Sequence, residues 1–131
     1  MKAASPLWLL ALILTTFPYM TMAEGAVREL DCISLQTCDT KGYCQTETQE
    51  VKFSMEPLAV NDDGSGSFAI HYNSYQAPMT SLSFAGPFHW TVGNERHTLL
   101  ASSETHFLWH QLDTSGSPSA RIQFMQCRFT Q

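Results

Sequence analysis

Basic residues are scarce in this chain of 131 residues, which holds 7 Lys and Arg against 12 Asp and Glu and has a formal net charge of −5. The basic side chains are scattered along the sequence rather than clustered. A nucleic-acid-binding surface needs a basic patch that neutralises phosphates, and an anionic membrane surface selects the same feature. The composition therefore predicts no nucleic-acid partner.

Long hydrophobic runs are missing after residue 23, so we expect no transmembrane segment in the mature chain, because a spanning helix needs ~20 apolar residues. Before that point, Lys2 is followed by the apolar run Leu7–Leu14 and then by the small-residue site Thr21-Met22-Ala23. This order is typical of a secretory signal peptide. We therefore assign residues 1–23 to a signal peptide, with cleavage after Ala26 as the second choice, and expect a periplasmic or secreted protein.

Sequence motifs for catalysis and cofactor binding are missing too. There is no Gly-x-Ser-x-Gly nucleophile elbow, no Cys-x-x-Cys redox pair and no glycine-rich phosphate loop. The sequence thus identifies no catalytic, cofactor-binding or metal-ligating residue, and an enzyme is the less favoured interpretation. The alternative is a small hydrolase or metal-binding protein that uses histidine and acidic side chains.

Histidines would carry that alternative, with His106, His110 and His89 as its candidates. On a strand, His106 and His110 share a face but lie ~13 Å apart at ~3.3 Å per residue, which is too far for one ion. His71 and His97 would join them only through the fold. We therefore expect strand histidines rather than a metal site.

Four cysteines are present: Cys32, Cys38 and Cys44 recur at even spacing, and Cys127 stands near the C-terminus. An even number behind a signal peptide predicts two disulfides in an oxidising compartment. We expect Cys38–Cys44, which closes a short loop, and Cys32–Cys127, which ties the first strand to the last. The spacing leaves open Cys32–Cys38 together with Cys44–Cys127. A zinc site is not favoured, because zinc-binding pairs are typically separated by roughly two to four residues.

Short alternating segments separated by turn signals fill the rest of the chain. Residues 51–55 and 68–72 alternate between apolar and polar side chains on either side of the turn Asn61–Gly66, which predicts a hairpin of half-buried strands. Asp62 and Asp63 in this turn match no calcium-loop spacing, and turn formation explains them. We expect a loop over residues 73–78, strands over 79–84, 88–92, 97–102 and 105–112, and a last strand in which Ala120, Ile122 and Phe124 share the apolar face, with a bulge at Phe124-Met125.

Turn signals recur roughly every 8 to 12 residues, and no segment shows helical periodicity. We therefore predict a signal peptide over residues 1–23 and a single β-domain over residues 24–131. The predicted fold is all-β, a small antiparallel β-sandwich or barrel of about 7–8 short strands, stapled by disulfides.

The three early cysteines, the strand-rich middle and the C-terminal segment Arg121-Ile122-Gln123-Phe124-Met125-Gln126-Cys127 resemble small exported alphaproteobacterial proteins of uncharacterised function. The resemblance covers most of the mature chain. It implies a periplasmic or secreted bacterial β-domain and carries no catalytic residue across.

The aromatic residues Phe88, Trp90, Phe107 and Trp109 form the most suggestive set for function. Core packing is the favoured explanation for each of them. In a barrel or an open-ended sandwich, some of them would line an apolar ligand cavity or a recognition face. We therefore expect an exported binding or interaction module whose partner is an unknown protein or a small apolar ligand.

Overall fold

The computed structural model describes residues 25–130, so the expected signal peptide over residues 1–23 lies outside the described residues. In the described part, no helix is long and apolar enough to cross a membrane. The secondary structure consists of the strands β1 Arg28–Asp39, β2 Cys44–Gln45, β3 Gln49–Val60, β4 Gly66–Tyr72, β5 Tyr75–Ser81, β6 Phe88–Val92, β7 Glu95–Ala101, β8 His106–Asp113 and β9 Ser119–Thr130.

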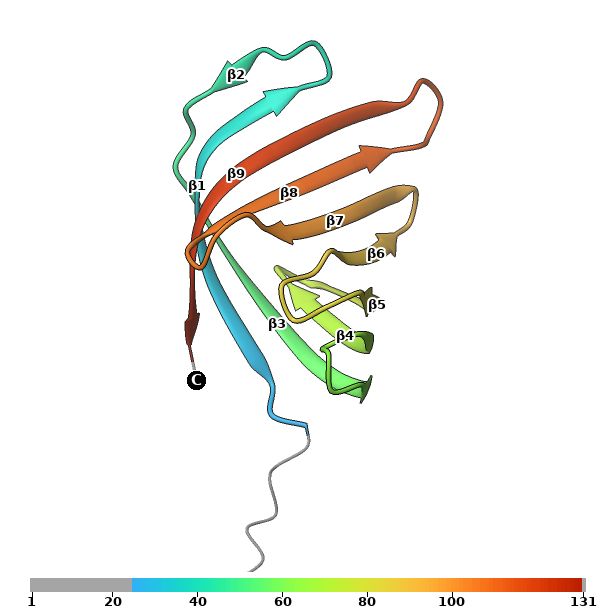
Figure 1. Ribbon diagram of the computed structural model, residues 1–131. Helices are drawn as coiled ribbons and strands as arrows, with labels where there is room; N and C mark the ends of the chain where they lie inside the picture. Colours follow the sequence, from blue (N-terminus) through green and yellow to red (C-terminus); the bar gives the residue numbers. More distant parts are fainter. Residues whose placement is uncertain (1–24, 131) are drawn as a thin grey trace, which may run out of the picture.

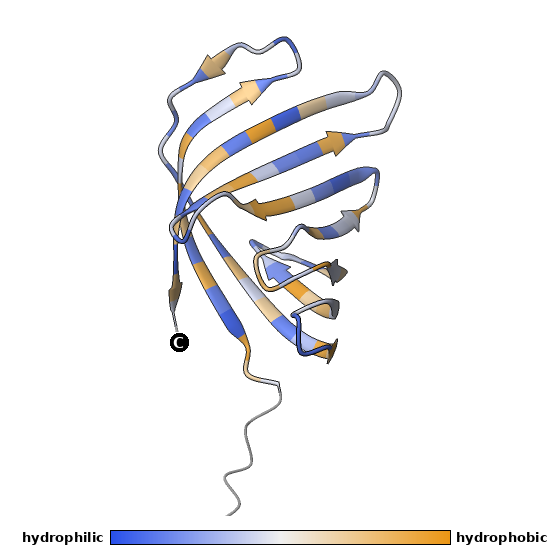
Figure 2. Ribbon diagram, viewed as in Figure 1, coloured by the Kyte–Doolittle hydropathy of each residue, from blue (hydrophilic) through white to orange (hydrophobic). Residues whose placement is uncertain are grey.

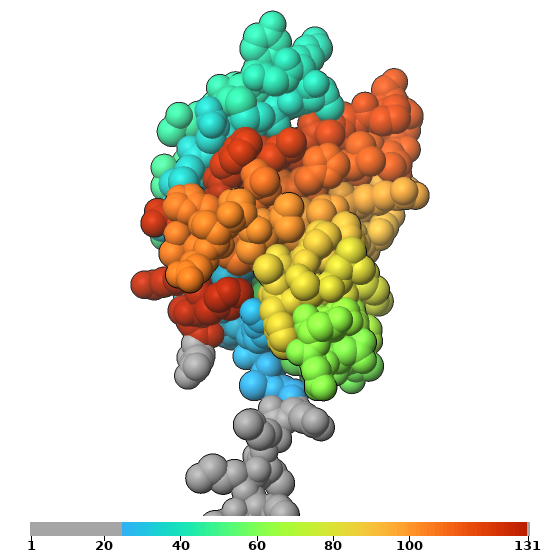
Figure 3. All heavy atoms as spheres, viewed as in Figure 1, coloured from blue at the N-terminus to red at the C-terminus, as the bar shows by residue number. Residues whose placement is uncertain are grey.

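Eight of the strands form a closed antiparallel barrel (Figure 1), in which consecutive strands from β3 to β9 pair side by side. The ring closes because β1 pairs with β3 on one edge and with β9 on the other. In Figure 3, the start of β1 lies beside the end of β9. Strand β2 is additional and pairs with the far end of β1. The predicted all-β fold is confirmed, and of the two expected architectures the barrel is the one that forms.

Both expected disulfides are present, and each joins two directly paired strand residues. Cys32–Cys127 crosses from β1 to β9 at the seam of the barrel. Cys38–Cys44 crosses from β1 to β2. The predicted pairing is therefore confirmed, and the alternative pairing does not form.

Apolar and polar residues alternate along the strands (Figure 2). The inward-facing side chains are buried and fill the barrel interior. An eight-stranded barrel has an interior just wide enough for side chains to fill. The predicted apolar faces of the β3–β4 hairpin point inward and are buried. The largest fully buried side chains are Phe53, Phe88, Leu30, Met55, Ile70, Met79, Leu99 and Met125.

The expected loop over residues 73–78 is wrong, because most of it belongs to β5, which begins at Tyr75. Asn73 has a φ of 50°, and Asn tolerates this left-handed conformation better than most residues. The β4–β5 connection is therefore a tight turn at Asn73-Ser74, and β5 pairs with β4 along its whole length.

The expected apolar face of the last strand is also wrong. In β9, Gln123, Met125 and Cys127 are buried, whereas Phe124 is exposed. The predicted irregularity does occur opposite Phe124 and Met125, but the extra residue is Leu35 in β1. Because the bulge lies in β1, the alternation of β9 continues without a break.

Candidate functional site

A cluster of aromatic side chains around His97 lies inside the barrel. His97 is an inward-facing residue of β7 and is 2% exposed. It stacks on Trp90, its cross-strand partner in β6, with ring centroids 5.0 Å apart and an interplanar angle of 8°. Trp109 of β8 and Tyr72 of β4 flank the imidazole, with centroid distances of 5.8 and 5.7 Å. A titratable ring is thus enclosed by the aromatic core.

Both ring nitrogens of His97 have neighbours that fix its tautomer. Trp109 Nε1 donates a hydrogen bond to His97 Nδ1 at 3.3 Å. Nε2 lies 3.3 Å from the Tyr72 hydroxyl and 3.6 Å from Glu95 Oε2. Since an indole N–H can only donate, Nδ1 is the acceptor, and the proton of the neutral ring resides on Nε2.

The cluster holds His97 in its neutral form. Burial, together with the positive charge of Arg121, lowers the pKa of His97 to about 4. The Arg121 guanidinium is itself held by two hydrogen bonds to Gln111 Oε1, from Nε at 2.7 Å and from Nη2. A second proton on the imidazole would sit on Nδ1 and face the Trp109 N–H, so protonation conflicts with the packing.

The His97 cluster does not have the geometry of a nucleophile–base–acid relay. In such a relay, one ring nitrogen faces the nucleophile and the other faces an acidic orienter. Here the Tyr72 hydroxyl and the Glu95 carboxylate both approach Nε2, while Trp109 occupies Nδ1. With a pKa of about 4, His97 is also far from the range of a general base that works near neutral pH.

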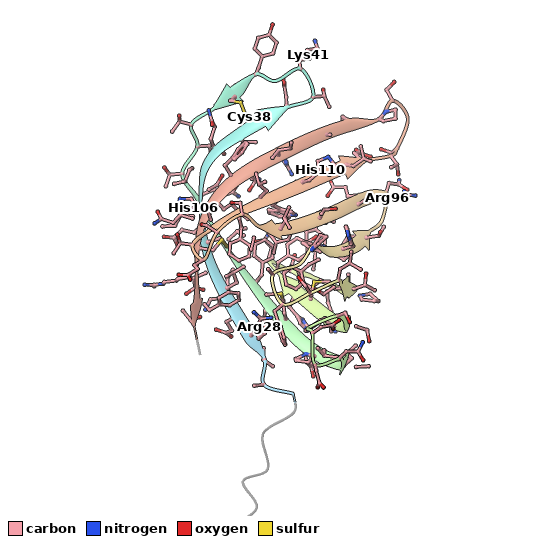
Figure 4. The ribbon with its side chains drawn as sticks, viewed as in Figure 1. Arg28, Cys38, Lys41, Arg96, His106 and His110 are labelled. Atoms are coloured by element: carbon pink, nitrogen blue, oxygen red, sulfur yellow. A yellow bond between two sulfur atoms is a disulfide. The ribbon has the colours of Figure 1, made fainter. Side chains whose placement is uncertain are left out.

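The other histidines point outward from the barrel and do not converge. His106 and His110 project from β8 (Figure 4), and His71 and His89 lie on the outer faces of β4 and β6. His106 Nδ1 lies within 3.2 Å of two hydroxyl groups of its own loop. Among residues 25–130, no group of three or more His, Cys, Asp or Glu side chains is placed to hold a metal ion.

The acidic turn between β3 and β4 uses its side chains to form the turn itself. Asp63 Oδ1 accepts hydrogen bonds from the Ser65 backbone N–H at 2.9 Å and from the Ser65 hydroxyl at 2.6 Å. These bonds lower the pKa of Asp63. Asn61 Nδ2 donates to the same hydroxyl at 3.0 Å.

The four aromatic residues singled out from the sequence all lie inside the barrel. Phe88, Trp90, Phe107 and Trp109 are at most 4% exposed and belong to the core. The structure brings Trp90 and Trp109 together, with ring centroids 6.4 Å apart beside His97. It places Phe88 against Phe68 instead, at 6.4 Å.

Directly behind this cluster, on the outside of the barrel, lies a groove of about 530 Å³. We call it the β5–β7 groove. Its floor is the point where Trp90 of β6 pairs with His97 of β7. Its walls are the outward residues of three adjacent strands, namely Pro78 and Thr80 of β5, His89 and Thr91 of β6, and Arg96 and Thr98 of β7.

The wall residues of the β5–β7 groove form two rows across the strands. In one row, His89 is paired with Thr80 on one side and with Thr98 on the other. His89 Nδ1 lies 3.1 Å from the Thr98 hydroxyl, which orients the imidazole. In the second row, Thr91 is paired with Arg96. The groove thus gathers hydroxyl, imidazole and guanidinium groups on a rigid sheet.

Two other grooves differ from the β5–β7 groove in the charged residues that line them. The first, of about 710 Å³, crosses β3, β1 and β9 and carries two carboxylates and two cations. There Lys52 Nζ lies 3.4 Å from carboxylate oxygens of both Glu29 and Asp31, and these carboxylates raise the pKa of Lys52. The second, of about 340 Å³, lies between Phe84 and Phe129. Its lining contains the carboxylate of Glu104 and no cation.

Sequence reasoning did not predict that His97 is buried in the aromatic core, and it did not single out Arg96. The burial of His97 could have been predicted from its position two residues before Leu99, because alternate residues of a strand share a face. Arg96 follows the turn at Gly93-Asn94, and nothing in its local sequence marks it. Its neighbours come from two other strands and depend on the register of the barrel.

Comparison of the chain with protein-family models, with curated proteins and with solved structures gave no match.

Proposed function

We propose that the chain is exported to the periplasm or the cell exterior and acts there as a non-enzymatic binding domain, with a small ligand held in the β5–β7 groove. Export is supported by the apolar leader sequence and by two disulfides, which form and persist in oxidising compartments. Because Pro78 and three threonines line the groove, we expect a ligand that has an apolar part.

One observation carries this proposal: the β5–β7 groove combines ligand-sized volume with polar groups on a closed, rigid barrel. Its volume of about 530 Å³ falls in the range of ~300–1,000 Å³ that small-molecule sites occupy. The groove lies on three consecutive, mutually paired strands, which hold its walls in place without a ligand. Binding therefore has a low cost in ordering the protein.

Filling the groove should weaken binding. We expect Thr91→Tyr, on the outer face of β6, to reduce the affinity for small apolar probes such as phenylnaphthylamine by about tenfold or more, because the new ring occupies the space of the ligand. Trp90 and Trp109 are the only tryptophans after residue 23. Quenching of their emission therefore reports on Trp90 at the groove floor and on Trp109 beside it inside the barrel.

The matched control is Ser54→Tyr, which adds the same side chain to the outer face of β3, away from the groove. It should leave probe affinity unchanged. Equal affinities of the wild-type chain and the Thr91→Tyr variant would contradict the assignment of the ligand to this groove.

Export is tested by expressing the full chain in a bacterial host and analysing the periplasmic fraction. We expect a product that begins at Glu24, or at Val27 if the second cleavage site is used, with all four cysteines resistant to alkylation until a reductant is added. A full-length, cytoplasmic product with reactive thiols would contradict export.

A further inference from the structure

We propose that the β5–β7 groove selects small organic anions, and that Arg96 contacts the anionic group. This inference rests on the proposed function, since it names the class of ligand for the same groove. The class covers carboxylates, sulfonates and phosphate esters that carry a compact apolar body.

The groove carries a positive charge, whereas the whole chain carries a net negative charge. Acidic residues outnumber basic ones by 12 to 7, yet the groove lining contains no carboxylate and includes the cation Arg96. Among the described residues, the Arg96 guanidinium has no ion-pair partner. By contrast, Lys52 is paired with carboxylates, and Arg121 is bonded to Gln111. Arg96 is therefore a cation available to a ligand.

The positions around Arg96 supply further donors. Thr91 lies directly across from Arg96 on β6, where paired Cβ atoms are ~4.5–5.5 Å apart. His89 lies diagonally across, at a spacing of ~7–8 Å that long side chains can bridge. A guanidinium offers several N–H donors in a planar fork that matches an oxyanion, and the neighbouring hydroxyl and imidazole groups supply additional hydrogen bonds.

The other side of the groove explains why the ligand is organic. Pro78 at the β5 wall presents its ring, and the methyl groups of Thr80 and Thr98 extend the apolar surface. A bare inorganic ion would leave this surface uncovered and most of the 530 Å³ empty. An anion with a flat apolar body would cover it while its charged group reaches Arg96.

Two fluorescent probes that differ by one sulfonate group test the inference. Anilinonaphthalene sulfonate carries one sulfonate, and phenylnaphthylamine is its uncharged parent. For the wild-type chain, we expect the sulfonate to bind about tenfold more tightly, because a hydrogen-bonded charge pair contributes roughly that factor. Added salt should weaken binding of the sulfonate and leave binding of phenylnaphthylamine nearly unchanged.

The variant Arg96→Gln should lower the affinity for the sulfonate by about tenfold and leave the affinity for phenylnaphthylamine unchanged. Arg128→Gln is the matched control, because Arg128 lines the groove across β3, β1 and β9 instead. Its affinities for both probes should equal those of the wild-type chain. Thermal unfolding of each variant checks that the barrel is intact.

The outcomes separate the inference from the proposed function. Equal affinity of the two probes, with Thr91→Tyr blocking both, would overturn the selection of anions and leave the groove as the binding site. Binding that Thr91→Tyr does not affect would overturn the proposed site and the inference together. A preference for the sulfonate that persists in Arg96→Gln would overturn the role of Arg96.

Discussion

Replacing Cys32 and Cys127 together by alanine should lower the free energy of unfolding by about 4 to 5 kcal/mol. The two residues are 95 positions apart in sequence, so their bridge restricts the unfolded chain over nearly its whole length. It also fastens β1 to β9, the first strand of the barrel to the last. Urea denaturation monitored by tryptophan emission measures the loss.

The second disulfide provides the matched control for this prediction. Cys38 and Cys44 are 6 positions apart, so removing both should cost only about 2 to 3 kcal/mol on the same chain-entropy model. The hairpin that they close lies beside the barrel and contributes little to its core (Figure 1). Equal losses for the two double variants would contradict the role of Cys32–Cys127 as the seam of the barrel.

Acidification should destabilise the fold between pH 6.5 and about pH 4 through His97. In the folded state the pKa of His97 is about 4, whereas an unperturbed histidine has a pKa of 6.5. Between these values the unfolded chain binds more protons than the folded chain, so stability falls as the pH falls. Through His97 alone, the free energy of unfolding near pH 4 should be about 3 kcal/mol lower than at neutral pH.

The variant His97→Gln isolates this contribution. Its amide oxygen can still accept a hydrogen bond from Trp109, but the side chain does not titrate. Between pH 7 and pH 4, the free energy of unfolding of this variant should fall by about 3 kcal/mol less than that of the wild-type chain. His71→Gln, on the outer face of β4, is the control and should retain the wild-type slope. A wild-type slope in His97→Gln would show that His97 is not buried in its neutral form.

Local sequence was enough to predict the features that depend on neighbouring residues. The alternation in residues 51–55 and 68–72 identified the buried faces of β3 and β4, because a tight turn fixes how the two strands pair. The presence of two disulfides followed from the even number of cysteines behind an export signal, whereas cysteine spacing alone left two pairings open. The choice of a barrel over a sandwich did not follow, since it depends on β1 pairing with β9 across the whole chain.

The candidate site was harder to predict for the same reason. Arg96 and Thr91 are close in sequence, but Pro78 and Thr80 join them only because β5 pairs with β6 in a particular register. Similarly, the inward face of β9 depends on the extra residue Leu35 in β1, which is far from Phe124 in sequence. The sequence identifies Trp90 as an aromatic candidate, whereas the burial of its partner His97 among aromatic rings depends on the closed barrel.

Mapping a bound probe by backbone amide chemical shifts tests the binding site most directly. With anilinonaphthalene sulfonate added to the disulfide-bonded chain, the largest shift changes should fall on Pro78's neighbours in β5, on His89 to Thr91 and on Arg96 to Thr98. Changes concentrated around Phe84 and Phe129, or around Gln126 and Arg128, would place the probe in one of the other grooves and contradict the assignment of function to the β5–β7 groove.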